Sequence, residues 1–329
     1  MKNLIRSIVV VATVATFSCV NLIANAQDIT FPDVPVGHSN YVPIHHLAEQ
    51  GIVNGNTDGD FEPNKDVNRV EALKMILETF GQFNADEIET PDEELFSDTN
   101  NKHWYVKYLI KAKGKGMADG YGDGRFGPND PVNLAESLKF LSKSLDNYLS
   151  ITPTEDPFAD TPSGKWYGEY VQWAKNRQLL SIDSSNKVHP TESISKGYLS
   201  SILYKLLKFG EGYKFGKATY YGEKFHGRTT ASGSKFDMFE MTAAHKELPF
   251  GTIVEVMNLA NGETVRVEIT DRGPYGHGRV IDLSAAAFEE IASLGAGILN
   301  VQYKVVTEDD DLEDENTTPD VFTNTITQE

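Results

Sequence analysis

The feature that most constrains this chain is an internal repeat in its first two thirds. The motif F-x-D recurs at positions 31, 96 and 158, so the copies are spaced 65 and 62 residues apart. Each copy continues through an amphipathic stretch and a loop marked by glycine or proline. A fixed period of this size is typical of repeat architectures, in which each unit buries its apolar face only against its neighbours. We therefore predict three related units at 27–90, 91–152 and 153–210.

Each copy is predicted to be all-α, with the order helix, loop, helix. In the first copy, Tyr41, Ile44 and Leu47 follow the spacing of one helical face. Asn68 precedes a second apolar stretch and is a residue type that caps helix N-termini.

Both ends of the chain are predicted to lie outside the folded domains. Residues 1–26 combine a basic start, an apolar run and a small-residue cleavage site, as in a secretory signal peptide. Cys19, the single cysteine, lies within this segment, and its context is not that of a lipoprotein anchor, so the exported chain is expected to lack cysteine. Residues 307–329 hold nine acidic and no basic residues, which predicts a disordered tail.

Composition excludes several classes of function. The net charge of −18 makes nucleic acid an unsuitable partner. Without cysteine, the exported chain can form no disulfide, cysteine metal site or thiol nucleophile. Nothing after residue 26 is apolar enough to predict a transmembrane segment. We expect neither a metal nor a cofactor.

From residue 211 to 306 the pattern changes to short alternating segments, which predict a small all-β domain. Asn261-Gly262 lies between two such segments and indicates a hairpin. One helix is predicted from Ser284 to Leu294. Within "ITDRGPYGHGRVIDLS" an apolar strand ends at Asp271, followed after Arg272 by a Gly-Pro pair, so we predict a carboxylate aimed by a constrained turn.

The repeats resemble S-layer homology domains, modules that hold exported proteins on cell-wall polymers. The segment "GIVNGNTDGDFEPNKDVNRVEAL" carries the resemblance most fully and has Arg69 where the family has the basic residue that meets the anionic polymer. Leu134 and Lys196 occupy the matching positions of the other copies. The resemblance therefore implies that Arg69→Ala weakens wall retention more than a substitution of Lys196 does.

Two tryptophans belong to the same pattern. Trp104 and Trp166 occupy matching positions in the second and third copies, where the first copy has Ser39. The resemblance places them at the polymer, but each also opens an amphipathic helix, and we favour core packing for both.

The β segment resembles the double-psi β-barrel of the rare lipoprotein A (RlpA) family of septal-ring lytic transglycosylases. The stretches "GKATYYGEKFHGRTTASG", "FDMFEMTAAHKELPFGTIVEV" and "ITDRGPYGHGRVIDLSAAAFEEI" carry it almost without gaps over 216–306. It implies a six-stranded barrel and cleavage of peptidoglycan glycan strands, preferably without stem peptides, to give 1,6-anhydro-MurNAc ends.

The resemblance also assigns catalytic positions. Asp271 matches the family's aspartate and would be the general acid, while His245 and Asp237 would orient it or bind the glycan. From the sequence alone, His245 is equally well explained as a structural histidine, and Asp237 as a turn residue. Members with lytic activity tend to have glutamate at position 234, where this chain has Ser234.

A set of polar and aromatic residues near these positions is predicted to contact the substrate: Tyr221, Thr230, Ser232, Ser234 and Arg272. An arginine aimed at Asp271 would oppose protonation of the acid, so we expect Arg272 to face the substrate or another carboxylate. Aromatic residues such as Tyr221 are also common in barrel cores.

Three functions remain open on these grounds. The first is a lytic transglycosylase of the cell envelope, held to a wall polymer by the repeats. The second is an expansin-like wall-binding protein whose barrel has lost the reaction. The third is an inverting hydrolase using Asp271 and Asp237, which requires their carboxyl groups to be roughly 6.5–9.5 Å apart.

Overall fold

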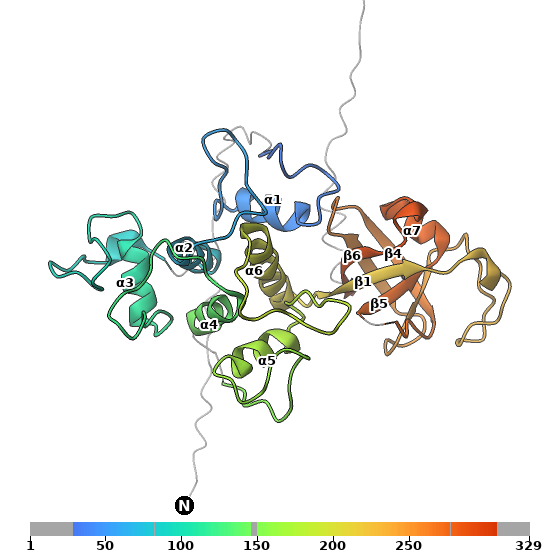
Figure 1. The fold of residues 1–329 in the computed structure, drawn as a ribbon. Helices are drawn as coiled ribbons and strands as arrows, with labels where there is room; N and C mark the ends of the chain where they lie inside the picture. Colours follow the sequence, from blue (N-terminus) through green and yellow to red (C-terminus); the bar gives the residue numbers. More distant parts are fainter. Residues whose placement is uncertain (1–28, 82, 146–149, 277, 308–329) are drawn as a thin grey trace, which may run out of the picture.

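A computed structural model describes residues 29–81, 83–145, 150–276 and 278–307. The predicted signal segment 1–26 and the predicted tail from residue 308 onward lie outside these ranges. Across the described ranges, every helix falls short of the length and apolar character that a membrane crossing requires. Figure 1 shows a helical part followed by a closed sheet.

Each repeat contributes two helices, and the second of each pair begins at the position aligned with Arg69. In chain order the six helices are α1 (Tyr41–Glu49), α2 (Arg69–Thr79), α3 (Val106–Gly114), α4 (Leu134–Ser144), α5 (Gly168–Asn176) and α6 (Lys196–Gly210). Asn68 caps α2, as predicted, and forms a reciprocal capping box with Glu71. Asn133 caps α4 in the same way, and Ser195 caps α6.

The three copies close around a ring of backbone hydrogen bonds. Val67 N–H donates to the carbonyl of Ile194 at 3.1 Å, Ile194 N–H to Val132 at 3.1 Å, and Val132 N–H to Val67 at 3.0 Å. Each link joins two different copies, so none of the copies completes this bonding alone. The closed ring explains why the repeat occurs three times and why α2, α4 and α6 gather at the centre in Figure 1.

The last third of the chain forms a six-stranded closed barrel, which confirms the predicted architecture. Its strands are β1 (Lys214–Tyr220), β2 (Thr242–His245), β3 (Ile253–Asn258), β4 (Thr264–Asp271), β5 (Arg279–Leu283) and β6 (Leu299–Val305). The spatial order is β1-β5-β2-β4-β3-β6, with parallel pairs β1/β5 and β2/β4. The predicted hairpin at Asn261-Gly262 joins β3 to β4, and Gly262 has a positive φ of 82°.

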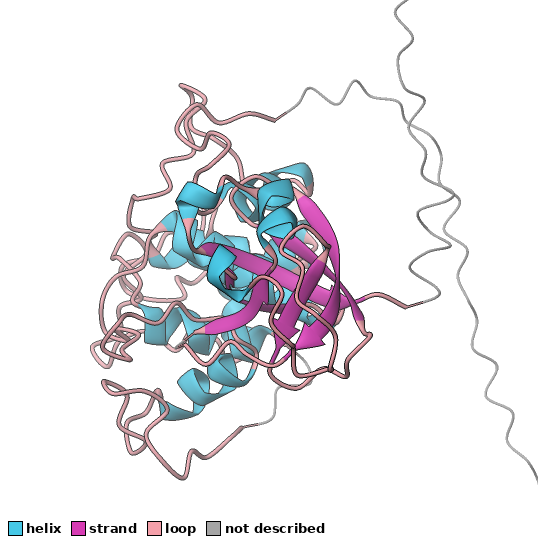
Figure 2. Ribbon diagram, turned by 90° about the vertical axis from the view of Figure 1, so that its right-hand side faces the viewer, coloured by secondary structure: helices cyan, strands magenta, loops and turns pink. Residues whose placement is uncertain are grey.

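One helix, α7 (Ala285–Ile291), covers part of the barrel. Ser284 caps it by accepting a hydrogen bond from Ala287 N–H at 3.1 Å. The predicted helix therefore exists, but it ends at Ile291 rather than Leu294, because Ser293 starts a separate short turn. Figure 2 shows the strands in magenta beside the cyan helices of the repeats.

The helical part and the barrel share a buried contact. Tyr204 of α6 donates its hydroxyl to Oε1 of Gln302 on β6 at 2.9 Å, and both side chains are buried. Tyr204 also packs with Phe215 and Leu259 of the barrel. Because α6 ends at Gly210 and β1 begins at Lys214, the connection is short, and the two parts are joined by packing as well as by the chain.

Candidate active site and wall-contact residues

Strand register brings two carboxylates to one row of the barrel wall. On β2, Ala244 pairs with Asp271 of β4 on one side and with Asp282 of β5 on the other. Residues paired directly across neighbouring strands present their side chains on the same face. At about 4.8 Å per strand, the two aspartates stand about 10 Å apart at their Cα atoms.

The two carboxylate oxygens of Asp271 have different surroundings. Oδ1 accepts hydrogen bonds from the backbone N–H groups of Ala231 and Arg272, both at 2.8 Å. Oδ2 meets only the hydroxyl of Tyr221, at the long distance of 3.4 Å, among the partners within the described part of the chain. One oxygen is thus held firmly by the backbone, whereas the other has one long contact.

Tyr221 is a hydrogen-bond donor to this carboxylate. Burial raises the pKa of its phenol well above the usual value, and the negative charges of Asp271 and Asp282 raise it further. The ring packs edge-on against Phe225 and Phe236. The phenol therefore stays protonated at neutral pH and orients Oδ2.

The turn after β4 has the backbone that its sequence predicts. Gly273 adopts a φ of 143°, a region that favours glycine, and the peptide bond to Pro274 is cis. Both residues are buried. The constrained turn follows Asp271 directly and fixes where β4 ends.

Arg272 does not form an ion pair with Asp271. Its guanidinium lies over the ring of Phe250, 3.8 Å from the centroid, and Nη1 donates to the carbonyl of His245 at 3.3 Å. This agrees with the expectation that the side chain is directed away from the acid, although the predicted contact with substrate stays a prediction.

His245 is held by other partners. Its Nδ1 accepts the backbone N–H groups of Glu247 and Leu248 at 3.1 and 3.0 Å, so the ring proton lies on Nε2, 3.0 Å from the hydroxyl of Tyr303. Burial lowers the pKa of the ring, which favours its neutral form. These contacts match the structural interpretation of His245, and its catalytic role stays a prediction.

Asp237 and the predicted hydroxyl residues lie on the loop between β1 and β2. Asp237 Oδ1 accepts Phe239 N–H at 2.9 Å and lies 3.6 Å from Nδ1 of His226, which are contacts of a turn residue. The side-chain oxygens of three residues form a closed triangle with edges of 2.9, 2.9 and 3.0 Å: Thr230, Ser232 and Ser234. Ala231, whose N–H donates to Asp271, lies between Thr230 and Ser232 in the chain.

Asp282 was not predicted from the sequence to be a site residue. It is buried, accepts a hydrogen bond from the hydroxyl of Thr219, and pairs with Arg279 at 2.5 Å between Nη2 and Oδ1. An acidic residue between the apolar residues Ile281 and Leu283 is the signal that could have found it. The structure thus adds a second carboxylate to the row of Asp271.

The three repeats meet at three equivalent junctions. At each, the first N–H of a second helix donates to a loop carbonyl of another copy: Arg69 to Asp130, Leu134 to Glu192, and Lys196 to Lys65. The first residue of the helix is a cation at two of these junctions, Arg69 and Lys196, and the apolar Leu134 at the third. The side-chain contacts at the three junctions therefore differ.

The first junction is closed by an internal ion pair. Arg69 is 4% exposed, donates from Nη1 to Glu136 at 2.6 Å and from Nε to the carbonyl of Phe126 at 2.9 Å, and lies over the Phe126 ring. A polymer would reach this guanidinium only if the contact with Glu136 opened. The predicted polymer contact of Arg69 stays a prediction.

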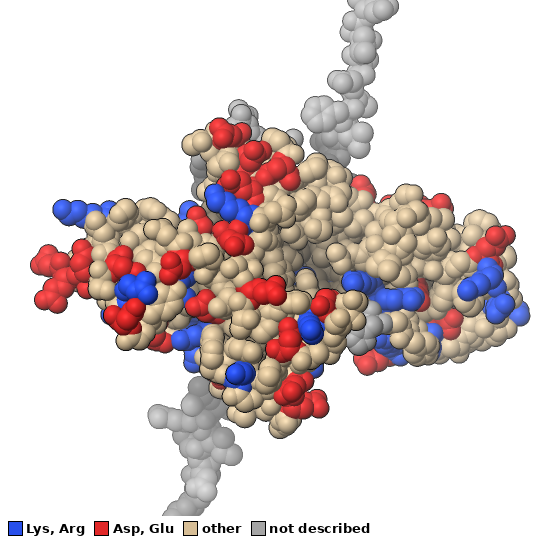
Figure 3. All heavy atoms as spheres, in the orientation of Figure 1, with Lys and Arg blue, Asp and Glu red and all other residues tan. Residues whose placement is uncertain are grey.

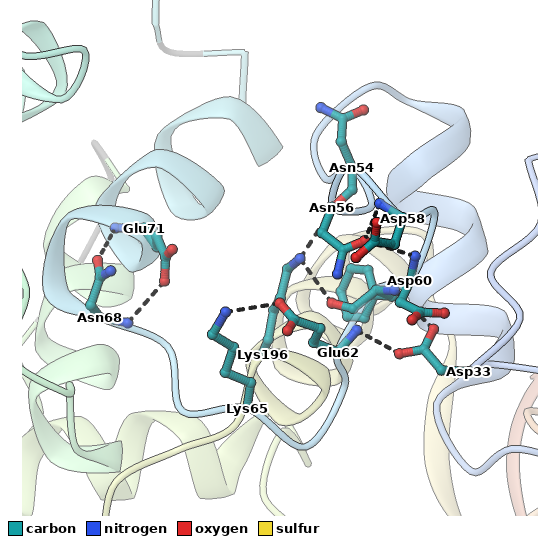
Figure 4. Close-up of polar contacts among 11 residues, drawn as sticks. Asp33, Asn54, Asn56, Asp58, Asp60, Glu62, Lys65, Asn68, Glu71 and Lys196 are labelled. Carbon is teal, nitrogen blue, oxygen red and sulfur yellow. Dashed lines mark hydrogen bonds and ion pairs between the residues drawn. The ribbon is translucent and has the colours of Figure 1, made fainter.

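Figure 4 shows the junction of the third and first copies around Lys196. Its ammonium donates to the carbonyls of Asn54 and Phe61 at 3.2 and 3.0 Å and lies 4.1 Å from the centroid of the Phe61 ring. Burial lowers the pKa of this lysine. At the remaining junction, Leu134 lines a pocket of about 340 Å³ together with Val188.

The preference for core packing of Trp104 and Trp166 was wrong. Their side chains are 55% and 56% exposed, and each ring packs edge-on against two neighbouring tyrosines. They lie before the first turn of α3 and α5, so residues within those helices, such as Leu109 and Trp173, fill the core instead.

Comparison with known proteins recognises both parts of the chain. Residues 213–303 match a family model described as lytic transglycolase, and residues 30–73 and 95–136 match the S-layer homology domain. The third copy lies outside the matched residues, but it has the same pair of helices and the same place in the hydrogen-bonded ring.

Several proteins resemble the barrel. The endolytic peptidoglycan transglycosylase RlpA of Vibrio cholerae is 42% identical over 137 residues, which are 40% of this chain and 52% of that protein. The probable endolytic peptidoglycan transglycosylase RlpA of Treponema pallidum is 56% identical over 86 residues, or 26% of this chain and 27% of that protein. The solved structure of Streptomyces papain inhibitor has 31% identity and a TM-score of 0.24, and the match covers 29% of this chain and 94% of that one.

The chain spans about half the length of the first of these relatives and about a quarter of the second. The barrel of this chain thus matches the lytic transglycolase family model, and the helical part that precedes it matches the S-layer homology domain model.

Proposed function

We propose that this protein is an exported lytic transglycosylase of the cell envelope that cleaves the MurNAc–GlcNAc bond of peptidoglycan glycan strands. The domains would be those expected from the sequence, with a wall-binding unit at 27–210 and a catalytic barrel at 211–306. The observation that carries the proposal is the asymmetric environment of Asp271 in a barrel of this family.

The chemistry needs one carboxyl group. Asp271, protonated on Oδ2, gives its proton to the glycosidic oxygen as that bond breaks and positive charge develops at C1 of the muramic acid. The C6 hydroxyl of the same sugar attacks C1, and the carboxylate takes up the hydroxyl proton. The products are a 1,6-anhydro ring and a free GlcNAc hydroxyl, with no water consumed.

Wall binding is assigned to the repeats. Trp104 and Trp166 offer exposed aromatic surface of the kind that packs on sugar rings, and Lys196 supplies a cation at one junction. Figure 3 shows acidic side chains over much of the helical part in that view, so an anionic polymer would need such a local cation. Arg69 would contribute if its ion pair with Glu136 opened.

The second candidate is a wall-binding barrel without catalysis. It is favoured by Ser234, which puts a hydroxyl in the triangle with Thr230 and Ser232 where lytic members of the family tend to have glutamate. The inverting hydrolase is less well supported, because the contacts of Asp237 lie within its own loop.

Substituting Ser234→Glu separates the first two candidates. If the missing carboxylate limits the enzyme, the variant should release anhydro-muropeptides from denuded glycan strands faster than the wild type does. If both proteins are inert on strands that an established lytic enzyme digests, the wall-binding function replaces the enzymatic one.

A further inference from the structure

Arg272 carries a positive charge that no carboxylate balances within the described residues. Its guanidinium contacts are the Phe250 ring and the carbonyls of His245 and Asp271. Carbonyl dipoles and an aromatic face orient a guanidinium, but they do not neutralise it. A half-buried arginine of this kind favours an anionic ligand.

The position of this charge is fixed relative to the candidate acid. The backbone N–H of Arg272 donates to Oδ1 of Asp271 at 2.8 Å, and Phe250, itself 40% exposed, supports the guanidinium from one side. Nε and Nη2 have no acceptor among the residues that the structure describes, so two N–H-bearing atoms remain for a ligand. This arrangement suits a planar carboxylate, which can accept two parallel hydrogen bonds.

The proposed substrate offers one such group close to the reacting bond. The muramic acid that is cleaved at C1 carries a lactyl group at C3, and its carboxylate is free only where the stem peptide has been removed. In a peptide-bearing strand the same group is an uncharged amide.

We propose that Arg272 binds this free lactyl carboxylate and thereby determines the specificity of the site for peptide-free strands, an inference that rests on the proposed function. The reaction that supplies the substrate is then hydrolysis of the amide bond between the lactyl group and the stem peptide. Arg272 thus acts as a binding residue, while proton transfer remains with Asp271.

Binding measurements with uncleaved strands test this role separately from catalysis. Asp271→Asn protein would be titrated with soluble peptide-free strands and with the same strands after conversion of their carboxylates to methyl amides. We expect the free-carboxylate strands to bind about 10- to 100-fold more tightly, the range given by a charge-assisted hydrogen bond. Adding Arg272→Gln should abolish this preference, and Arg272→Lys should retain part of it.

Arg266→Gln is the matched control, since Arg266 lies on β4, which ends just before Arg272, and its Nε is 3.5 Å from Oε2 of Glu255. It should keep the full preference. A preference that survives Arg272→Gln, or that Arg266→Gln removes equally, would overturn the inference. If the wild type cleaves no strand while the Arg272-dependent preference persists, the enzymatic proposal fails and the binding role stands. If the wild type cleaves both kinds of strand equally well, the inference alone fails.

Discussion

Asp33 in the first repeat and Asp271 in the barrel are both held by backbone N–H groups, but they use their oxygens differently. Oδ1 of Asp33 accepts from Phe61 at 2.8 Å and Oδ2 from Glu62 at 2.6 Å, so the carboxylate clamps two successive residues of a loop. In Asp271, Oδ1 accepts two N–H groups, while Oδ2 contacts, within the described part of the chain, only the distant hydroxyl of Tyr221.

Under the proposed function, this difference separates a structural carboxylate from the one that transfers a proton. In the other copies, Asp98 and Asp160 also accept two successive loop N–H groups, one on each carboxylate oxygen. A contact that recurs in every copy is expected of a residue that stabilises the fold. Asp271 is held as firmly through one oxygen, but its second oxygen has no backbone contact among the described residues. Substitutions at the two kinds of site should therefore affect different properties.

The largest effect is expected for Asp271→Asn. The amide fills the same space but carries no transferable proton, so release of anhydro-muropeptides should fall by about 10²- to 10⁴-fold. The melting temperature and glycan binding should change little. A variant that keeps wild-type turnover would show that Asp271 is not the acid.

Arg69→Ala should cause the largest loss of stability in the repeats. It removes the buried partner of a partly buried ion pair and leaves Glu136 with the Asn133 N–H as its remaining contact among the described residues. Breaking a fully buried pair costs about 3–5 kcal/mol, which is an upper bound here. Urea unfolding measures this loss, and co-sedimentation with isolated cell wall measures retention. Lower retention with unchanged stability would instead support direct contact between Arg69 and the polymer.

Asp33→Ala should destabilise the protein by less, about 1–3 kcal/mol, because two loop N–H groups lose a partly solvated acceptor. Turnover on peptide-free strands, measured well below the unfolding temperature, should stay close to that of the wild type. A loss of turnover as deep as that of Asp271→Asn would remove the distinction between the two aspartates.

The smallest effect concerns pH and contrasts two histidines. Burial lowers the pKa of His245 below its usual 6.5, so the unfolded chain binds more protons between the two values. Its contribution to stability is present above about pH 6.5 and is lost as the pH falls toward the lowered pKa. His245→Asn should therefore flatten the decline of the urea midpoint below about pH 6.5.

The pKa of His189 is shifted in the opposite direction from that of His245. A hydrogen bond to Asp183 raises its pKa, so its contribution is present below the unfolded value and is lost as the pH rises through the raised pKa. Because His189 is exposed, His189→Asn should alter the midpoint only slightly, and in that opposite direction. Equal responses of the two variants would contradict these assignments.

The sequence predicted the parts of this molecule that depend on local pattern. The three repeats, the cap at Asn68, the hairpin at Asn261-Gly262 and the turn after Asp271 all follow from residue spacing and backbone preference. The exposure of Trp104 was not predicted, because amphipathic spacing does not distinguish a residue within a helix from one just before its first turn. The closeness of Asp282 to Asp271 was missed because it depends on the pairing of both strands with Ala244.

The central claim is that the barrel cleaves glycan strands by proton transfer from Asp271 without consuming water. Peptide-free strands should be incubated with the wild type in water enriched in heavy oxygen, and the products analysed by mass spectrometry. We expect unlabelled anhydro-muramic ends with the wild type and almost none with Asp271→Asn. Labelled reducing ends would show hydrolysis, and an absence of any product from the wild type would leave a wall-binding protein; either result would contradict the account.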